Sequence, residues 1–206
     1  MTDNDRLFVL EKIGCAADVS DKLDAYAALL CEWQEKMNLV AKSTLPVLWT
    51  RHILDSAQLT AYLTADDKKI VDFGSGAGFP GLVLAVLNPE KQVHLIESDM
   101  KKAAFLSAVT EKLGLDNVTV HRDRIEKIII NQAHIITARA LAPLETLLAY
   151  VLPYMGEQTR CLFMKGKKAE EEISVARKKF LFSLTTHPSI TSEEGKILLI
   201  SKAVKK

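Results

Sequence analysis

A glycine-rich segment between an apolar run and a helical run constrains the fold of this chain more than any other feature. Residues 72–81 read Asp-Phe-Gly-Ser-Gly-Ala-Gly-Phe-Pro-Gly and directly follow the β-rich run Ile70-Val71. Glycines in such a turn adopt backbone angles that other residues avoid, and they let a ligand approach the main chain. In an open parallel sheet, ligands bind beyond the carboxyl ends of the strands. The segment therefore predicts a ligand-binding turn after the first strand of an α/β sheet.

Strand-like and helix-like segments alternate through the rest of the chain. Strands are expected at residues 70–73, 93–97, 118–120, 135–137 and 161–164, and helices at 81–87, 101–113, 125–130, 143–154 and 168–180. This alternation predicts a parallel sheet with helices on both faces. The last two expected strands, 181–186 and 196–201, are joined by a short loop and must pair antiparallel. Residues 67–206 are therefore expected to form an open, mostly parallel sheet that ends in an antiparallel hairpin.

The first 66 residues show a purely helical pattern. An apolar stripe with steps of three and four residues predicts an amphipathic helix with its stripe in the core; it consists of Leu23, Tyr26, Leu30, Trp33 and Met37. A shorter helix is expected from Asp3 to Ile13, and another begins near Pro46 and carries residues 51–56. Residues 1–66 are therefore expected to form an N-terminal helical cap.

The composition excludes several classes of protein. The chain is 48% hydrophobic and 26% charged with a net charge of +1, which is ordinary for a folded domain and argues against disorder. Its apolar runs fall short of the roughly 20 residues that cross a bilayer, and no signal-peptide pattern begins the chain. The three cysteines are far apart, which argues against zinc and disulfides. We expect a cytoplasmic protein without a bound metal and without membrane contact.

Two kinds of ligand fit the glycine-rich segment. Residues 76–81 satisfy the dinucleotide fingerprint G-x-G-x-x-G, and Glu97 lies 21 residues after its first glycine, where a carboxylate binds ribose hydroxyls. Asp72, two residues before the first glycine of the G-x-G-x-G pattern at 74–78, is instead typical of the methyltransferase form of the loop, which binds S-adenosylmethionine. The expected hairpin and the lack of room for a dehydrogenase substrate domain also favour S-adenosylmethionine. A glycine turn without a ligand is the third interpretation, which the acidic residue at the ribose position disfavours.

Further motifs resemble one bacterial protein family. Besides the glycine-rich segment, they are W-Q-E-K-M-N-L at 33–39, R-H-I-L-D-S at 51–56, R-I-E at 124–126, R-A at 139–140 and K-G at 165–166. In this order and spacing they resemble the RsmG family, also called GidB, over nearly the whole chain. The glycine-rich segment alone indicates only a class I methyltransferase, whereas R-H-I-L-D-S together with F-P-G after the glycines is more particular.

The resemblance implies a fold, an activity and a set of site residues. The fold is the Rossmann-like fold of class I S-adenosylmethionine-dependent methyltransferases, and the activity is methyl transfer to guanine N7 in the 530 loop of 16S rRNA. The loop pattern and the resemblance together predict these cofactor contacts: Asp72, Gly74, Gly76, Gly78, Phe79, Glu97, Ile125, Glu126 and Arg139. Arg139 is also expected to position the target, and Arg51, His52 and Lys165 are expected to bind RNA.

One position departs from the family pattern. The family usually has an aspartate just before the fourth strand, where this chain has Ala133-His134. An aspartate that only orders the entry to the strand would make the change harmless. An aspartate that orients the site would require His134 to take its place, and the sequence leaves both interpretations open.

The absence of two sequence motifs also agrees with guanine N7 as the target. It has no Asn-Pro-Pro-Tyr-like tetrapeptide, which serves attack by exocyclic amines, and no Pro-Cys dipeptide, which serves attack at C5. Guanine N7 already carries an in-plane lone pair and takes a methyl group without losing a proton. No general base is therefore expected, and in-line positioning supplies about 7–11 kcal/mol. His52 is the candidate if a base is required.

The polar residues assigned to RNA have simpler interpretations as well. On an α-helix, His52 and Asp55 share one face that is expected to look toward the crevice, but an Arg51–Asp55 ion pair with a surface histidine explains the same spacing. Residues 160–206 carry a net charge of +6. Their lysines at 165, 167 and 168 either contact RNA phosphates or only solvate the start of a glutamate-rich helix.

Two other functions are compatible with the sequence. One is a methyltransferase of the same fold that acts on another RNA, a protein or a small molecule. The other is a nucleotide-binding regulatory protein without catalysis. For the leading interpretation we expect a monomer whose partner is 16S rRNA or the small ribosomal subunit; whether the RNA is naked or assembled stays open.

Overall fold

The computed structural model describes residues 3–128 and 130–206, so two residues of the expected cap and one residue of the expected helix 125–130 lie outside it. In the described chain, seven strands form one sheet in the order β3-β2-β1-β4-β5-β7-β6. Strands β1 to β5 are parallel, and β7 runs antiparallel to both of its neighbours. The bounds are β1 Lys69–Phe73, β2 Gln92–Ile96, β3 Val118–His121, β4 Ile135–Arg139, β5 Arg160–Lys165, β6 Phe180–Pro188 and β7 Lys196–Lys205.

The expected open sheet with a C-terminal hairpin is confirmed, but the hairpin strands are longer than the sequence predicts. Residues 196–201 of β7 pair with β5 on one edge, and beyond them β7 pairs with β6 alone, as far as Lys205 opposite Phe180. The expected helix 168–180 is shorter, since α7 covers Ala169–Ala176 and β6 already begins at Phe180. The expected helix 125–130 is a single 3₁₀ turn, η4, at Ile125–Lys127.

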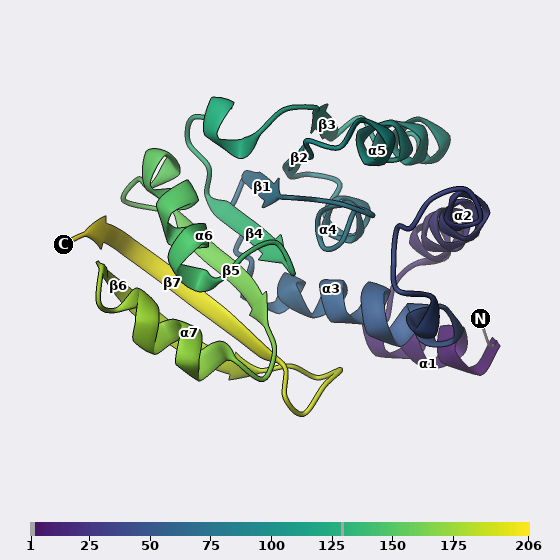
Figure 1. Cartoon of the computed structure of the whole chain (residues 1–206). Helices are drawn as coiled ribbons and strands as arrows, with labels where there is room; N and C mark the ends of the chain where they lie inside the picture. The colour runs from purple at the N-terminus through teal and green to yellow at the C-terminus, as the bar shows by residue number, and fades with distance from the viewer. Residues whose placement is uncertain (1–2, 129) are drawn as a thin grey trace.

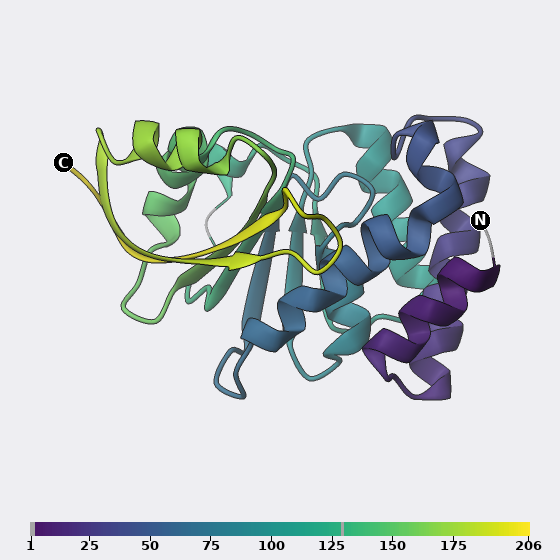
Figure 2. The ribbon, with the colours of Figure 1, turned by 90° about the horizontal axis from the view of Figure 1, so that it is seen from below.

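Helices cover both faces of the sheet (Figure 1). One face carries α4 (Gly81–Leu87) and α5 (Met100–Leu113), against which α2 (Ala17–Gln34) packs. The other face carries α6 (Leu144–Val151), which is followed by the 3₁₀ turn η5 (Leu152–Tyr154), and α7. Figure 2 shows the N-terminal helices at one end of the molecule and the β6–β7 hairpin at the other.

Alternating strand side chains build a separate apolar cluster on each face. Ile70 of β1 joins the cluster of α2, α4 and α5, whereas Val71, the next residue, joins the cluster of α6 and α7. This follows from the pleat, which points successive side chains to opposite faces. The helical region and the sheet therefore share one core on the α4–α5 face.

The predicted stripe of the long N-terminal helix is buried over most of its length. Leu23, Tyr26 and Leu30 are 0% exposed, and Trp33 is partly buried against the same cluster. Met37 lies beyond the end of α2 at Gln34, so the helix is shorter than the stripe. The shorter helix expected at Asp3 to Ile13 is present as α1.

The segment with the R-H-I-L-D-S motif is an irregular helix. It begins with a 3₁₀ segment, η1 (Lys42–Val47), continues with a π-helical segment, η2 (Trp49–Leu54), and proceeds through α3 (Asp55–Ala57) to a final 3₁₀ segment, η3 (Gln58–Tyr62). A π-helical turn contains more residues than an α-helical turn. Even so, His52 and Asp55 lie on one side of this helix, as predicted, because both hydrogen-bond the side chain of Arg139.

Two further expectations concern membranes and metals. Within residues 3–128 and 130–206, no helix has both the length and the apolar character to cross a bilayer. The same residues contain no cluster of three or more His, Cys, Asp or Glu side chains suited to a metal ion. All three cysteines are free thiols, and Cys161 is buried.

Candidate active site

The glycine-rich loop between β1 and α4 forms the first part of the site. Gly76 has a φ of +56°, a left-handed conformation that glycine adopts without strain. Its N–H donates to Oε2 of Glu97 at 2.8 Å, and Oε1 of Glu97 accepts from the Asp99 N–H at 2.7 Å. Each carboxylate oxygen has a second lone pair. Glu97, which directly follows β2, therefore holds the loop and can still accept hydrogen bonds from a ligand.

A cavity of about 250 Å³ lies beside this loop and is called the loop cavity below. A Cβ on Gly76 would have no neighbour closer than 3.8 Å, so the loop leaves open space there. Ribose hydroxyls need acceptors such as Glu97, and an adenine ring needs apolar neighbours such as Ile96 and Ile125, so the residues present fit S-adenosylmethionine. The lining residues are Gly74, Gly76, Ile96, Glu97, Ser98, Lys102, Asp123, Arg124, Ile125, Glu126, Ala140, Leu141 and Tyr150.

The predicted cofactor residues fall into two groups. The first group lines the loop cavity and consists of Gly74, Gly76, Glu97, Ile125 and Glu126. The second group lies around the loop but outside the described lining of this cavity; it consists of Asp72, Gly78, Phe79 and Arg139. The residues of the second group contact the loop, the helical region or each other.

Asp72 lies behind the loop, inside the sheet. It is 0% exposed, and its Oδ1 accepts a hydrogen bond from the Thr137 hydroxyl at 2.7 Å. The Ser75 hydroxyl donates to the Asp72 main-chain carbonyl at 3.1 Å. Burial raises the pKa of Asp72 to about 6, against the hydrogen bonds that favour its ionised form. Asp72 therefore ties β1 to β4 and supports the loop from below.

The helical region holds the loop from the opposite side. The Tyr26 hydroxyl on α2 donates to the main-chain carbonyl of Ala77 in the loop. The ring of Phe79 lies 5.3 Å from that of Tyr26 and stacks on the ring of His52 at 5.0 Å, both measured between centroids. Gly78 is enclosed as well, because a Cβ there would come within 2.7 Å of the Tyr26 hydroxyl. These contacts join the predicted cofactor loop to the R-H-I-L-D-S motif.

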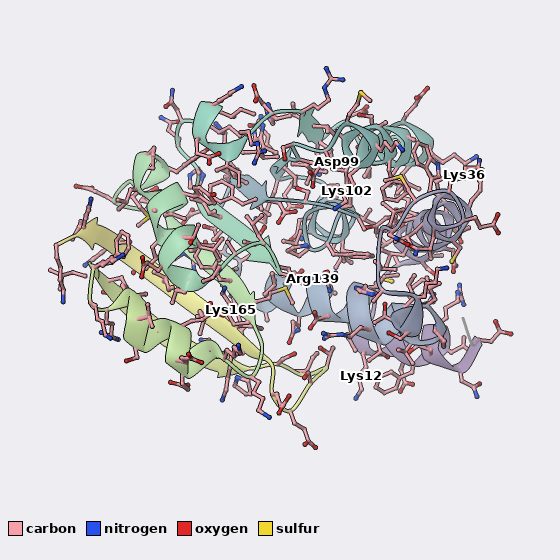
Figure 3. The ribbon with its side chains drawn as sticks, viewed as in Figure 1. Lys12, Lys36, Asp99, Lys102, Arg139 and Lys165 are labelled. Carbon is pink, nitrogen blue, oxygen red and sulfur yellow. The ribbon has the colours of Figure 1, made fainter. Side chains whose placement is uncertain are left out.

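Arg139, the last residue of β4, is the centre of a polar cluster (labelled in Figure 3). Its Nη1 donates to Oδ2 of Asp55 at 3.3 Å, and its Nη2 donates to Nδ1 of His52 at 2.8 Å. Its Cζ lies 5.0 Å from the centroid of the Phe79 ring, in cation–π range. Burial lowers the pKa of the guanidinium, and the Asp55 carboxylate opposes that shift. Arg139 is thus held in one orientation by three other side chains.

The hydrogen bonds of His52 define its tautomer. Arginine only donates, so Nδ1 of His52 must accept the bond from Arg139. The Thr44 hydroxyl donates to the Ala41 carbonyl at 2.7 Å, so it accepts from Nε2–H of His52 at 2.8 Å. Burial, followed by the charges of Arg139 and Arg51, lowers the pKa of His52 to about 3. His52 is therefore neutral at physiological pH, and its lone pair is already used.

A second cavity, of about 430 Å³, is called the basic cavity below. Ala140 and Leu141 line both cavities and so form the wall between them. Ala140 has a φ of +54°, which costs a residue with a side chain about 1–2 kcal/mol. A Cβ on Gly74 would come within 2.5 Å of Leu141 Cδ1, so the wall rests on the glycine-rich loop. The charged residues that line the basic cavity are Arg51, Asp55, Arg139, Lys165, Glu172 and Lys196.

Known proteins are similar to this chain in sequence. The family model GidB, described as rRNA small subunit methyltransferase G, matches residues 19–200. The chain belongs to the GidB family. It is 44% identical over 190 residues to the ribosomal RNA small subunit methyltransferase G of Paramagnetospirillum magneticum, covering 92% of each chain. It is 45% identical to the protein of the same name from Rhodospirillum centenum, covering 92% of this chain and 87% of that one.

Solved structures are similar to this GidB-family chain in fold. An S-adenosylmethionine-dependent methyltransferase from Aquifex aeolicus superposes with a TM-score of 0.60 at 16% identity, covering 75% of this chain and 93% of the other. The fibrillarin–Nop5p complex contains a chain with a TM-score of 0.59 at 15% identity, covering 74% and 81%. The class I methyltransferase fold is thereby confirmed. The family also confirms the chain as a methyltransferase with S-adenosylmethionine as its cofactor.

Two polar residues of this GidB-family chain have partners that the sequence did not indicate. Among the described residues, Asp55 forms its ion pair with Arg139 and not with Arg51, so the simpler interpretation of that motif is wrong. Nζ of Lys165 pairs with Glu172 at 2.7 Å and donates to the Ala142 carbonyl at 2.6 Å. Lys165 lines the basic cavity, but a neighbouring carboxylate offsets its charge.

The turn between β6 and β7 is a part of the site that the sequence analysis missed. Ser189, Ser192 and Gly195 line the basic cavity together with Lys196. A signal was available, because a strand paired antiparallel with β7 must end at the same edge of the sheet as β5. The turn of the predicted hairpin therefore had to lie at the ligand-binding edge.

The departure from the family pattern lies at the opposite edge of the sheet. The His134 N–H donates to the Lys69 carbonyl at 3.0 Å, and the His134 carbonyl accepts from the Arg160 N–H at 2.8 Å. These residues stand at the amino ends of β4, β1 and β5. Ala133-His134 therefore lies at the edge of the sheet away from both cavities, where the main chain of His134 pairs with β1 and β5.

Proposed function

We propose that this chain transfers a methyl group from S-adenosylmethionine to N7 of a guanine in the 530 loop of 16S rRNA. The observation that carries the proposal is the pair of neighbouring cavities that share Ala140 and Leu141 in their linings. The loop cavity has the glycine backbone and the carboxylate that a nucleoside cofactor needs. The basic cavity has the positive charge that an RNA nucleotide needs. Two ligands in these cavities would lie on either side of Ala140 and Leu141, directly after the end of β4.

The cofactor side uses the residues around the loop cavity. Gly76 offers its open backbone, Glu97 accepts from the ribose hydroxyls, and Ile125 and Glu126 flank the adenine. Asp72 and Phe79 hold the loop from its two sides. When bound, S-adenosylmethionine supplies an electrophilic methyl group.

The residues of this chain orient the nucleophile and do not deprotonate it. Guanine N7 has a lone pair in the ring plane and no proton. Arg139 is fixed by Asp55 and His52, so its guanidinium offers a positive charge in one orientation at the edge of the basic cavity. His52 is an unsuitable base, because its pKa is about 3 and its Nδ1 already accepts from Arg139. Positioning is therefore the main catalytic contribution.

The RNA side uses the charged mouth of the basic cavity. Arg51 is exposed and lines this cavity. Lys167, whose side chain is 81% exposed, and the exposed Lys168 follow β5 at the same edge. Phosphate contacts from such residues position RNA without reading its sequence. Lys165 contributes to the wall of this cavity, and His52 acts through Arg139, which it holds by a hydrogen bond. The protein acts as a cytoplasmic monomer on 16S rRNA or the small ribosomal subunit.

The test is methyl transfer from labelled S-adenosylmethionine to naked 16S rRNA and to small ribosomal subunits, both isolated from cells that lack this protein. Mass mapping then locates the label. Label at guanine N7 in the 530 loop supports the proposal. Label at another position or on a ribosomal protein assigns a different substrate, and cofactor binding without any transfer supports the regulatory alternative.

A further inference from the structure

Asp55 connects three segments that lie far apart in the sequence. Its Oδ2 accepts from Arg139 at the end of β4 at 3.3 Å. Its Oδ1 accepts from the Thr191 hydroxyl in the β6–β7 turn at 2.5 Å. Asp55 itself belongs to the irregular helix and is 5% exposed. One buried carboxylate thus joins the helical region, the sheet and the hairpin.

A second residue of the same helix reinforces the attachment of the turn. Oε1 of Gln58 accepts from the Ile190 N–H at 2.9 Å, and Nε2 of Gln58 donates to Oδ1 of Asp55 at 2.9 Å. Figure 2 shows the yellow turn lying against the blue helix. Ser189, Ser192 and Gly195 of the turn line the basic cavity together with Arg139. The turn is held by hydrogen bonds to residues more than 130 positions away in the sequence.

We propose that Asp55 is a positioning residue that fixes Arg139 and the β6–β7 turn relative to each other, and so sets the shape of the basic cavity for the target base. This inference rests on the proposed function for its kinetic consequence. Both oxygens of Asp55 are used, one toward each element. A neutral side chain at this position leaves the buried guanidinium of Arg139 without its carboxylate.

The chain contains a matched control for a buried Asp–Arg pair. Asp67 is 4% exposed, and its Oδ2 accepts from Nη2 of Arg160 at 2.5 Å. This pair also joins a residue outside the sheet to the end of a strand, here the connection before β1 to the start of β5 at the amino ends of the strands. Asp55→Asn and Asp67→Asn remove the same charge from similarly buried sites at opposite edges.

The first measurement is steady-state kinetics on small ribosomal subunits, with cofactor affinity from calorimetry. We expect Asp55→Asn to lower kcat at least 20-fold and to leave cofactor affinity within threefold of wild type. We expect Asp67→Asn to keep kcat within twofold of wild type. Its fall in Tm is expected to be at least as large as that of Asp55→Asn. Wild-type kcat in Asp55→Asn overturns the inference, and so does an equal loss of kcat in both variants, because the role is then only structural.

The second measurement does not depend on the substrate. Amide hydrogen exchange in residues 189–195 of the free protein reports how firmly the turn is attached. We expect Thr191→Val and Asp55→Ala to speed this exchange at least tenfold, and Asp67→Asn to leave it unchanged. Unchanged exchange in Asp55→Ala overturns the attachment even if wild type methylates 16S rRNA. Faster exchange in a protein that does not methylate 16S rRNA instead contradicts the proposed function alone.

Discussion

The two edges of the sheet carry the same kind of ion pair in different surroundings. At the carboxyl edge Arg139 pairs with Asp55, and at the amino edge Arg160 pairs with Asp67. Each pair joins an aspartate outside the sheet to an arginine at the end of a strand. Arg139 also donates to His52 and lies at the edge of a cavity, whereas Asp67 is held by the main chain of Thr64.

The comparison shows that the surroundings of an ion pair decide its role. Asp67 accepts from the Thr64 N–H and the Thr64 hydroxyl as well as from Arg160 at the start of β5, and none of these residues lines the basic cavity. Asp55 distributes its oxygens over an arginine and a distant turn. A buried pair of the first kind stabilises the fold. A pair of the second kind positions groups around a ligand.

The largest expected effect compares two glycines at opposite edges. Gly76 and Gly114 have φ of +56° and +59°, and added side chains meet open space at both. Valine at either position therefore strains the backbone similarly, by about 1–2 kcal/mol. We expect Gly76→Val to weaken S-adenosylmethionine binding at least 100-fold in calorimetry, and Gly114→Val to leave it unchanged. Equal affinity in the two variants would remove the loop from the cofactor site.

The second prediction compares Arg139 and Arg160, whose replacement is expected to affect the rate of methyl transfer and the free energy of unfolding, respectively. We expect Arg139→Ala to lower methyl transfer about 100-fold at saturating substrates, which corresponds to about 2.7 kcal/mol. We expect Arg160→Ala to lower the free energy of unfolding by about 1–3 kcal/mol, because it leaves the buried Asp67 without its cation, and to keep kcat. Urea unfolding and initial rates on the same preparations measure both quantities. A normal rate in Arg139→Ala contradicts the role of the cluster.

The third effect compares two glutamates that flank β2. Glu97 follows the strand and lines the loop cavity, whereas Glu90 precedes the strand and its side chain is 61% exposed. Loss of a charged acceptor weakens binding by about 1.5–3 kcal/mol. We expect this loss of S-adenosylmethionine affinity in Glu97→Gln and none in Glu90→Gln, with kcat at saturation unchanged in both. A fall in kcat without a fall in affinity would place Glu97 in another role.

The smallest effect concerns acid stability. The pKa of His52 is about 3 in the folded protein against about 6.5 unfolded, so its stabilisation is complete above about pH 6.5 and is lost as the pH falls toward 3. Burial alone would raise the pKa of Asp67, but hydrogen bonds from Thr64 and Arg160 outweigh it and leave the pKa below its ordinary value. The stabilisation from Asp67 is therefore lost only below about pH 3.9. The free energy of unfolding falls between pH 7 and pH 4.5. We expect this fall to be smaller in His52→Asn than in wild type, by up to about 2 kcal/mol.

The control for this effect is Asp67→Asn. It lowers stability at neutral pH, but its decline between pH 7 and 4.5 matches that of wild type. Thermal or urea unfolding at a series of pH values measures both variants. An identical decline in His52→Asn and wild type would contradict the low pKa of His52.

The sequence by itself determined the order of the elements and the place of the cofactor loop. The alternation of strands and helices, the glycine-rich segment and Glu97 are local patterns, because side-chain periodicity and backbone freedom depend on neighbouring residues. The same holds for the family resemblance, whose motifs are short and contiguous. These patterns predicted the open sheet, the hairpin and five residues that line the loop cavity.

Only the tertiary structure decided which charged groups are partners. Asp55 pairs with Arg139 and Thr191 instead of Arg51, and Lys165 pairs with Glu172. Asp55, Arg139 and Thr191 come from segments that are far apart in the sequence and meet at the carboxyl edge of the sheet. An ion pair or a cavity wall forms between groups that are close in space. For residues far apart in the sequence, that closeness cannot be predicted from their spacing along the chain.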